Sequence, residues 1–358
     1  MASKYTSIGG QAVIEGVMMR SPHYLAVALR TMDQSIVIRE QRWKGIADRF
    51  PIFKKPFLRG VCTLIESMWN GVEALSYSAN RAMAEEEAAK AKSSNKSISE
   101  SDKPLSSLAI ATSIFFAFAM GMGLFVALPH VLALWIGSAG LFQEGVQNPV
   151  FHIVDGVIKV AVLVAYIYLI ALMKDIKRVF QYHGAEHKSI AAFEAGHDLT
   201  IENARKYSTL HPRCGTSFLL FLMINSILIF SIAFPVLGLT KLSDIAFLNH
   251  VLMVLVKIVL MVPVAAISYE FIRLSANHMD KLFFKILIAP GLLLQRLTTR
   301  EPDDSQLEIA LASLRAVLAL EKANDTSSIN HGGTPSEKTY HQLSEVAFAP
   351  AAVSEFPG

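Results

Sequence analysis

The sequence predicts a mainly α, polytopic helical membrane protein, with about four transmembrane helices and a small N-terminal α+β cytoplasmic portion. Three observations predict it: an apolar composition, four long apolar stretches, and an uneven distribution of lysine and arginine. Of the 358 residues, 52% are hydrophobic and 18% charged, and the mean hydropathy is +0.40. Soluble domains carry about 25% charged residues. Part of this chain is therefore expected to lie in lipid.

Four stretches approach the roughly 20 apolar residues that a membrane-spanning helix needs. They are residues 107–128, 153–173, 215–239 and 251–269. The first has no charged residue and is expected to end at Pro129. The second contains Asp155 and Lys159, which lie on one helical face and can pair, and the fourth contains Lys257. A lysine near a helix end usually extends its ammonium group to the lipid headgroups, and we favour this interpretation over a role in transport.

The basic residues flank these stretches on alternate sides. The loop 137–152 has no lysine or arginine, and the loop 238–250 has only Lys241. The other flanking segments are basic, through Arg81, Lys90, Lys92, Lys96, Lys103, Lys174, Lys177, Arg178, Lys188, Arg205, Lys206 and Arg213. Lysine and arginine mark the cytoplasmic side of a membrane protein. Both termini are therefore predicted to be cytoplasmic, and no N-terminal signal peptide is evident.

Residues 1–87 are predicted to form a cytoplasmic hairpin followed by an amphipathic helix. Residues 24–30 and 35–42 alternate in polarity around a short turn, which indicates a hairpin at one edge of a small sheet. After Pro56, apolar residues recur at steps of three and four. They are Phe57, Val61, Leu64, Ile65, Met68, Trp69, Val72 and Leu75. This helix either packs on the sheet or lies on the membrane surface, and both alternatives remain open.

The remaining chain is divided by composition. Residues 88–104 form a linker, residues 105–273 the four-helix transmembrane region, and residues 174–215 a cytoplasmic loop within it. Residues 274–322 hold an interfacial segment and a C-terminal helix, which Asp303 or Asp304 can cap. The apolar run 282–297 is interrupted by Lys285 and Pro290, so it is expected to be interfacial or re-entrant rather than spanning. Residues 323–358 are expected to be a disordered tail.

The cytoplasmic loop contains the residues best suited to chemistry. His183, Glu186 and His187 form the inverted zinc-binding arrangement H-x-x-E-H. On a helix the two histidines project from one face and can share a metal, while Glu186 lies beside them as a general base. A solvated helical face rich in histidine and glutamate is the alternative interpretation.

Three further residues are candidate metal ligands. His211 and Cys214 precede the third predicted span, and Glu270 ends the fourth, so all three are expected at the same side of the membrane as His183. Glu194 is the rival to Glu270, but it lies about 10 Å along the helix axis from His187 at 1.5 Å per residue. The two cysteines of the chain, Cys62 and Cys214, are expected to be free thiols or metal ligands rather than a disulfide.

Charged residues beside glycines and beside the spans are candidates for substrate binding. Gly9 and Gly10 precede Glu15 and Arg20, and Arg20 could hold an anionic group with two hydrogen bonds. The alternative is a tight turn in which Glu15 and Arg20 pair with each other. Arg213 and Arg273 are the other candidates. No basic stripe or phosphate-binding glycine pattern is present, so the sequence does not indicate nucleic-acid or nucleotide binding.

Three segments together carry a resemblance to a known family. They are I-G-G-Q-A-V-I-E-G-V-M-M-R from Ile8, Y-H-G-A-E-H-K from Tyr182 and H-P-R-C-G-T-S from His211. These motifs resemble those of the YqhQ-like family of bacterial membrane proteins, from about Ser7 to Leu320. The resemblance implies a bacterial inner or plasma membrane and a metal-dependent enzyme of unknown activity, with His183, Glu186, His187, His211 and Cys214 in the family pattern.

Two classes of function follow from these residues, with a third less favoured. The first is a zinc hydrolase acting at the cytoplasmic membrane surface, with membrane lipids around it and a membrane protein or peptide as a candidate substrate. The second is a membrane scaffold or partner-binding protein, in which His183, His187, His211 and Cys214 form a closed structural site. The third is a transporter that uses Lys159 and Lys257.

Overall fold

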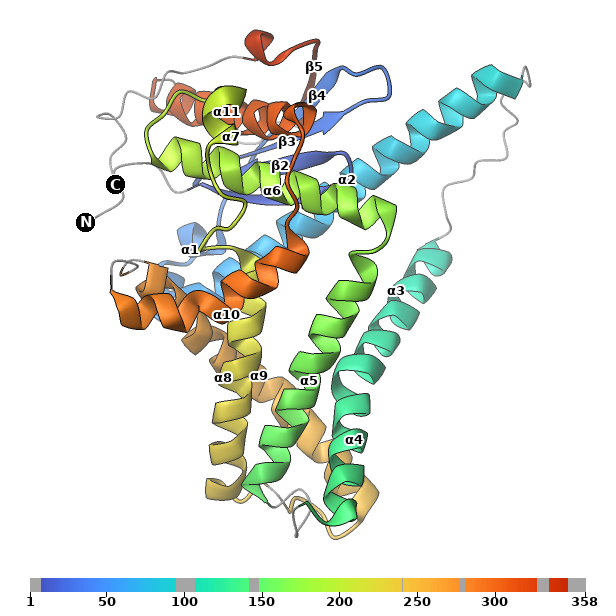
Figure 1. Cartoon of the computed structure of the whole chain (residues 1–358), viewed down its shortest axis with the longest axis vertical. Coiled ribbons are helices and arrows are strands. Elements are labelled where there is room, and N and C mark those ends of the chain that lie inside the picture. Colours follow the sequence, from blue (N-terminus) through green and yellow to red (C-terminus); the bar gives the residue numbers. More distant parts are fainter. Residues whose placement is uncertain are drawn as a thin grey trace. The chain divides into compact units, whose positions relative to one another are not determined.

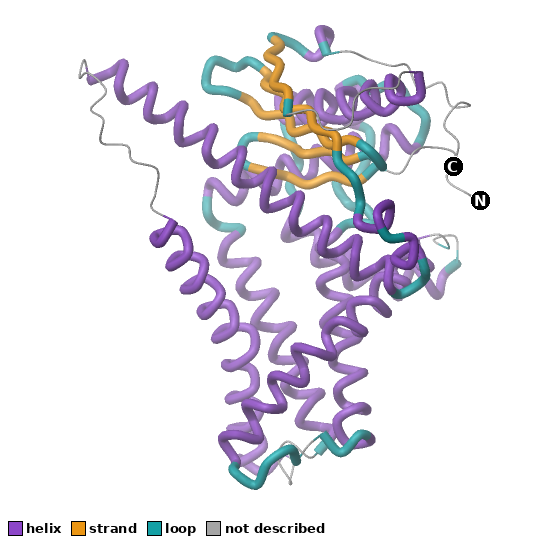
Figure 2. The backbone as a smooth tube through the Cα atoms, turned by 180° about the vertical axis from the view of Figure 1, so that it is seen from behind, coloured by secondary structure: helices purple, strands orange, loops and turns teal. Residues whose placement is uncertain are grey.

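The structure is a computed structural model that describes residues 8–94, 107–141, 148–239, 241–276, 278, 281–326 and 335–346. The chain divides into two compact units, and three separate segments contribute to the first: Met1–Asn95, Ile170–Pro212 and Gln295–Gly358. The second comprises Lys96–Leu169 and Arg213–Leu294. Helices predominate, and the described strands belong to one antiparallel sheet (Figures 1 and 2). The predicted fold class is confirmed.

The sheet of the first unit has the order β1-β2-β3-β4-β5. Its strands are β1 (Gly9–Val13), β2 (Gly16–Arg20), β3 (Tyr24–Arg30), β4 (Ile36–Arg42) and β5 (Ser336–Tyr340). The predicted hairpin is confirmed as β3 and β4, paired from Tyr24 with Arg42 to Arg30 with Ile36. The prediction that it forms a sheet edge is wrong, because β2 pairs with β3 on one side and β5 pairs with β4 on the other.

The two faces of this sheet are covered by different helices (Figure 2). Side chains of successive strand residues point to opposite faces. Accordingly Met19 and Ala26 pack into one buried cluster with α6 (Lys174–Glu194) and α11 (Asp304–Thr326). Their neighbours Met18 and Leu25 pack into a second cluster that includes Ala74 of α2 (Leu58–Ser94). The sheet is therefore enclosed between helices, which fixes the position of α6 against β1.

Helix α11 begins at a reciprocal cap. The amide of Gln306 donates to Asp303 Oδ1 at 2.9 Å, and the Asp303 amide donates to Gln306 Oε1 at 2.9 Å. Such a capping box satisfies backbone donors that a helix N-terminus leaves without partners. The predicted C-terminal helix is thus confirmed, with Asp303 rather than Asp304 as the cap.

The prediction of a disordered tail is wrong for part of the tail. Ser336–Tyr340 forms β5 and pairs with β4, and a 3-10 turn follows at Leu343–Glu345. Leu343 and Val346 are buried in the cluster of α6 and α11. The segment is polar in sequence, and it is ordered because β4 offers an edge to which it can hydrogen-bond. Residues 327–334 and 347–358 of the predicted tail lie outside the described residues.

Helix α2 packs its polar and small residues on the sheet. Glu73 pairs with Arg39 of β4 at 3.0 Å, Glu66 lies 3.7 Å from Arg20 of β2, and Gly71 lies against Gln11 of β1. The apolar side chains that predicted the helix are instead exposed, namely Phe57, Ile65, Met68, Trp69, Val72 and Leu75. The helix therefore packs on the sheet, the first of the two alternatives, but through its polar and small residues and not through the apolar face.

The predicted linker 88–104 is in part helical, since α2 continues to Ser94. Alanines and alternating Glu and Lys residues favour helix there, including an i, i+4 pair between Glu86 and Lys90. The rest of this linker, residues 95–104, lies outside the described residues. Short elements complete the first unit: α1 (Ile46–Arg49), a 3-10 turn (Pro51–Lys54) and α7 (Ile201–Arg205).

Among the described residues of the second unit, four helical stretches are long and apolar enough to cross a membrane. They are Phe115–Gly140, Val150–Ile170, Gly215–Val236 and Ala246–Ser275. The corresponding elements are α3 (Ser107–Met122) with α4 (Leu128–Ile136), then α5 (Pro149–Ile170), α8 (Gly215–Val236) and α9 (Ala246–Ala276). The chain is thus a helical membrane protein. Helix α10 (Leu282–Thr298) continues through Pro290.

Two details of the spans differ from the predictions. The first stretch does not end at Pro129, because a π-helical turn at Gly123–Ala127 joins α3 to α4 and Pro129 lies in the first turn of α4, where a missing N–H is tolerated. Lys257 does not extend to the headgroups. It is buried, and its Nζ donates to Asp155 Oδ2 at 3.1 Å. The predicted pair of Lys159 with Asp155 is confirmed at 2.7 Å.

Candidate metal centre

The H-x-x-E-H motif lies in the middle of α6. His183 Nδ1 is 2.8 Å from the carbonyl oxygen of Thr298, and His187 Nδ1 is 2.5 Å from that of Thr209. A carbonyl oxygen only accepts hydrogen bonds, so each Nδ1 carries the proton. Each Nε2 is then the atom with the lone pair that a metal can use. Both rings are thereby fixed in the tautomer and orientation of a metal ligand.

Gly184 explains how a backbone segment reaches the motif. A Cβ added at Gly184 would lie 2.1 Å from the carbonyl oxygen of Arg300, a distance that real side chains do not show. The Arg300 amide donates to the carbonyl of Phe180 at 2.9 Å. The chain after α10 therefore passes directly along α6 only because residue 184 has no side chain. This close passage places the Thr298 carbonyl beside His183.

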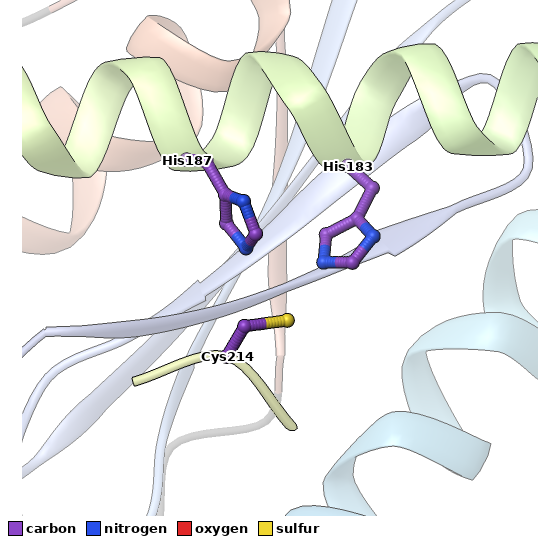
Figure 3. Close-up of side chains that lie close together, drawn as sticks. All are labelled: His183, His187 and Cys214. Carbon is purple, nitrogen blue, oxygen red and sulfur yellow. The ribbon is translucent and has the colours of Figure 1, made fainter. Parts of the chain in front are cut away.

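Cys214 completes a group of three candidate ligands. One ligand atom from each of His183, His187 and Cys214 lies within 4.8 Å of the others, and Figure 3 shows both rings and the sulfur directed toward a common point. Cys214 is the N-cap of α8, and the Thr216 amide donates to its Sγ at 3.4 Å. A cysteine sulfur is a ligand type that zinc accepts.

These residues fit a divalent metal. Two neutral imidazoles and one thiolate are ligands that zinc accepts, and His187 and Cys214 are both buried. The carbonyl partners of the two Nδ1 atoms are the outer contacts that usually accompany histidine ligands. A solvated helical face, the alternative interpretation of the motif, does not describe this geometry, because Glu186 and His187 are buried along with the glycine and alanine between the histidines.

Glu186 lies under strand β1. Its side chain is buried, and a Cβ added at Gly10 would lie 2.7 Å from Glu186 Cγ and Oε1. Burial raises the pKa of the Glu186 carboxyl, and the nearby rings of His183 and His211 oppose that rise. A buried carboxyl with a raised pKa beside candidate ligands is suited to accept and return a proton. The absence of a side chain at Gly10 in β1 thus leaves room for the Glu186 side chain.

His211 lies next to the group of three without belonging to it. Its ring centroid is 5.6 Å from that of His187, and its Nε2 is 3.5 Å from Glu194 Oε2. The side chain of Gln295 holds its backbone from both sides, accepting from the His211 amide and donating to the His211 carbonyl, each at 2.8 Å. Burial lowers the pKa of the His211 ring, and Glu186 opposes this shift.

The other predicted site residues have different surroundings. Glu270 lies in α9 and is not a member of the group that contains Cys214, and Arg213 and Arg273 are exposed. Glu15 and Arg20 do not pair with each other. Glu15 bonds through both carboxylate oxygens to Arg178 and lies 3.3 Å from the Tyr182 hydroxyl. Arg20 stacks 4.0 Å over Trp43 and faces Glu66.

Several contributors to the site were not predicted from sequence. The carbonyls of Thr209 and Thr298 have no side-chain signature, and Gln295 lies in a segment that the sequence presents as an apolar helix. Lys188, which follows the motif, is buried and bonds to Glu301 at 2.6 Å and to the Arg205 carbonyl at 3.1 Å. The sequence offered two signals, a lysine directly after H-x-x-E-H and a glycine within the motif.

Fold and site together define a polytopic helical membrane protein with a small antiparallel sheet and a candidate metal centre on α6. The chain belongs to the family described as Protein of unknown function (DUF1385), whose model matches residues 55–320. It is similar to the Uncharacterized protein YqhQ of Bacillus subtilis (strain 168), with 33% identity over 323 residues that cover 88% of this chain and 94% of that relative. No solved structure matches the chain.

Proposed function

We propose that this chain is a metal-dependent membrane enzyme, in which His183, His187 and Cys214 hold a divalent metal, zinc by their chemistry, and Glu186 is the general base. The reaction is hydrolysis of an amide or ester bond, with a membrane protein, peptide or lipid as the substrate class. The observation that carries the proposal is the pair of Nδ1-to-carbonyl bonds, which orient two histidines of one helix toward the Cys214 sulfur.

The number of convergent ligands supports catalysis over a structural site. Three protein ligands leave a metal one position for water or substrate, whereas structural zinc sites are closed by four. The scaffold alternative keeps one specific observation in its favour, because the His211 ring lies 5.6 Å from the His187 ring and could supply a fourth ligand. The two candidates therefore differ in whether His211 coordinates.

In the proposed hydrolysis, Glu186 transfers the proton. A bound divalent metal would supply Lewis acidity, polarising an acyl oxygen and lowering the pKa of water. Glu186 takes one proton from water on a carboxylate oxygen as the water oxygen adds to the acyl carbon. It returns this proton to the leaving nitrogen or oxygen as the acyl bond breaks, so the carboxylate is regenerated. Burial excludes bulk water from Glu186 and keeps its pKa above the ordinary range, which favours the return step.

A substrate-independent experiment separates enzyme from scaffold. The full chain is purified in detergent, loaded with Co²⁺ in place of zinc, and titrated with azide or acetohydroxamate while its visible absorption is followed. We expect thiolate-to-cobalt absorption and a saturable change on adding either compound, because an exchangeable position binds it. A spectrum that neither compound changes would indicate a closed site and favour the scaffold.

Substitutions identify the ligands. His183→Ala, His187→Ala and Cys214→Ser should each lower metal affinity at least about 100-fold, since each removes one of three donors. Matched controls are His197→Ala, an exposed histidine in the same unit as His183, and Cys62→Ser, the other buried cysteine. Metal content by mass spectrometry is the measurement. Full retention in a His183→Ala/His187→Ala double variant would contradict the proposed site.

Glu186→Gln tests the proton step. The amide has nearly the same size but cannot accept the proton, so metal content and melting temperature should stay near wild type while hydrolysis falls about 10²- to 10⁴-fold. The readout is release of a fluorophore from a panel of lipid-ester and peptide-amide substrates presented in detergent micelles. Glu202→Gln, at an exposed position on α7, is the control. Wild-type rates in Glu186→Gln would remove Glu186 from the reaction.

The distribution of basic residues supports a cytoplasmic membrane location in a bacterium, with both termini and the metal centre on the cytoplasmic side. In intact cells, cysteines at Ser138 and Asp244 should react with a membrane-impermeant thiol reagent, and those at Lys206 and Ser305 should not. All four of these positions are exposed. Labelling of Lys206→Cys from outside would overturn this orientation.

The exposed apolar face of α2 is a second candidate lipid contact, in addition to the four candidate spans. Ile65, Met68, Trp69 and Val72 are all more than half exposed, while the polar side of the helix is held on the sheet. A helix with an apolar face and a tryptophan fits the membrane interface, and exposed Lys54 and Lys55 before it suit anionic headgroups. Brominated lipids should quench Trp69 fluorescence in a Trp43→Phe/Trp135→Phe background, and unquenched emission would contradict this contact.

A further inference from the structure

The helices of the second unit enclose a group of ionisable side chains. Its member on α9, Lys257, lies far from both ends of that helix. Asp155 and Lys159 come from α5, and Lys257 comes from α9. One carboxylate oxygen, Asp155 Oδ2, accepts from Lys159 Nζ at 2.7 Å and from Lys257 Nζ at 3.1 Å. Asp155 and Lys257 are 2% and 6% exposed. Charged residues this deeply buried in a membrane protein usually serve a function.

The charges of this group do not balance. Two ammonium groups share one carboxylate, so the group has a formal charge of +1. Lys159 is partly exposed and can reach solvent or headgroups, but Lys257 is enclosed, with its Nζ 5.8 Å from the Phe151 ring centroid and 5.7 Å from that of Phe234. Aromatic faces stabilise a cation only in part. An uncompensated charge in such surroundings destabilises the folded chain.

Three histidines surround the charged group, and two of them have buried nitrogens without partners. His130 on α4 is joined to His250 on α9, with Nε2 and Nδ1 3.0 Å apart, while its own Nδ1 has no partner among the described residues. His152 on α5 is 2% exposed, and within the described part of the chain neither of its nitrogens has one. A neutral imidazole always carries one N–H, so His152 presents a buried donor. Lys257, Lys159 and Asp155 lie near enough to act electrostatically on both rings.

His130 and His152 are both buried within the second unit. Their rings pack in the apolar interior of the unit: His130 lies 5.1 Å from Phe151, and His152 lies 5.1 Å from Phe234. An unpaired N–H in such a position costs free energy that a hydrogen-bonding ligand would recover. Excess positive charge and the unpaired donor of His152 thus occur together between α5, α8 and α9, beside His130 of α4.

We infer that Lys257, His152 and His130 form a binding site for a small anion within the helices of the second unit. The anion supplies the missing negative charge to Lys257 and an acceptor for the His152 N–H, and it also accepts from His130 Nδ1 when His130 Nε2 accepts from His250. Its chemistry is that of a compact monovalent acceptor, which a free halide or small carboxylate provides and which the phosphate of an anionic lipid also provides. This site is distinct from the metal centre on α6, and its residues take no part in the proposed hydrolysis.

The experiment measures thermal unfolding of the full chain in a neutral detergent at constant ionic strength. Sodium gluconate, whose anion is bulky, is replaced stepwise by sodium chloride or sodium formate. A ligand that binds only the folded state raises the melting temperature in a saturable manner, by a few degrees for a chain of this size. We expect such a rise with chloride, formate or both. In a second arm, phosphatidylglycerol is added in gluconate, and a rise there alone would assign the site to a lipid phosphate.

Variants link the effect to the residues. His152→Phe removes the donor without altering charge, and Lys257→Met removes the cation, so the anion-dependent rise should shrink in the first and vanish in the second. Lys241→Met, at an exposed loop lysine, should retain it. If Lys257→Met does not fold, the His152→Phe variant alone shows whether the anion-dependent rise in melting temperature depends on this site. An equal rise in wild type and His152→Phe, or no rise with any of the three additives, would overturn the site.

Discussion

Two groups of buried polar side chains differ in how completely the chain satisfies them. In the candidate metal centre, both Nδ1 atoms of the motif histidines donate to carbonyls, and the His211 backbone is bonded in both directions by Gln295. In the charged group of the second unit, Asp155 Oδ1 and both nitrogens of His152 have no partner among the described residues. The first group is oriented in advance by the protein, and the second is not.

The difference agrees with the two uses that we propose for these buried polar atoms. A catalytic site needs ligands fixed before the metal arrives, because binding energy is lost if the protein must first order its side chains. A site that binds and releases a small ion can leave part of its hydrogen-bonding capacity to the ion. The comparison therefore predicts that a single substitution changes the stability of the chain by a different amount in each of the two groups.

The largest effect is expected at Asp155. Asp155→Asn removes the only carboxylate between Lys159 and Lys257 that the described residues supply, and leaves a buried ammonium uncompensated, so it should lower stability by about 3–5 kcal/mol. The measurement is the melting temperature of the full chain in detergent. Asp244→Asn, which breaks the exposed pair with Lys241, is the matched control and should have almost no effect.

A double variant distinguishes charge from packing in that result. Asp155→Leu combined with Lys257→Met removes both buried charges and should be less damaging than Asp155→Asn alone. If Asp155→Asn were no worse than Asp244→Asn, the group would not be held together by charge, and the comparison between the two groups would fail.

The second effect concerns the strand over Glu186. Gly10→Ala would place a methyl group 2.7 Å from Glu186 Cγ, whereas a Cβ at Gly9 would have nothing within 4 Å. Overpacking of a buried site costs about 1–3 kcal/mol. We therefore expect Gly10→Ala to lower the melting temperature and weaken metal binding, and Gly9→Ala to leave both near wild type.

Shortening Glu186 should relieve the crowding. In the Gly10→Ala/Glu186→Asp double variant, the shorter acidic side chain leaves room for the added methyl group. The melting temperature of the double variant should therefore be higher than the sum of the two single-variant changes predicts. Strict additivity would show that β1 and Glu186 are not in contact, and Gly10 would then have another role.

Sequence patterns predicted the elements whose residues carry their own signal. Alternation in β3 and β4, the apolar spacing in α2 and the Asp303 cap of α11 are local, so they could be recognised without the rest of the chain. Strand β5 could not, because its polar residues form a strand only by pairing with β4. Strand β2 was missed for a related reason: Val17, Met18 and Met19 are buried on both faces, and the period of two is lost.

The candidate site was predicted in its side chains and missed in its backbone. His183, His187 and Cys214 were identified from ligand type and spacing, and the structure groups them together. The carbonyls that orient the histidines belong to Thr209 and Thr298, and any residue type could have supplied them. Distant segments meet there through the fold, which a local pattern does not encode. The assignment of Glu270 as a ligand stays a prediction.

The smallest effect is expected at Glu15, and it tests whether this residue has more than a structural role. Glu15 and Arg178 are both about one third or more exposed, and exposed ion pairs contribute at most about 1 kcal/mol. Glu15→Gln should therefore change the melting temperature only slightly and leave metal content unchanged. If Glu15 only holds β1 on α6 through Arg178, the hydrolysis rate should also stay within about twofold of wild type, and Arg178→Gln should behave in the same way. A large loss of rate in Glu15→Gln but not in Arg178→Gln, with metal retained in both, would mean that the Glu15 carboxylate contacts the substrate. The metal centre would then extend to the β1–β2 turn, and its contrast with the incompletely paired group around Asp155 would be smaller than the hydrogen bonds suggest.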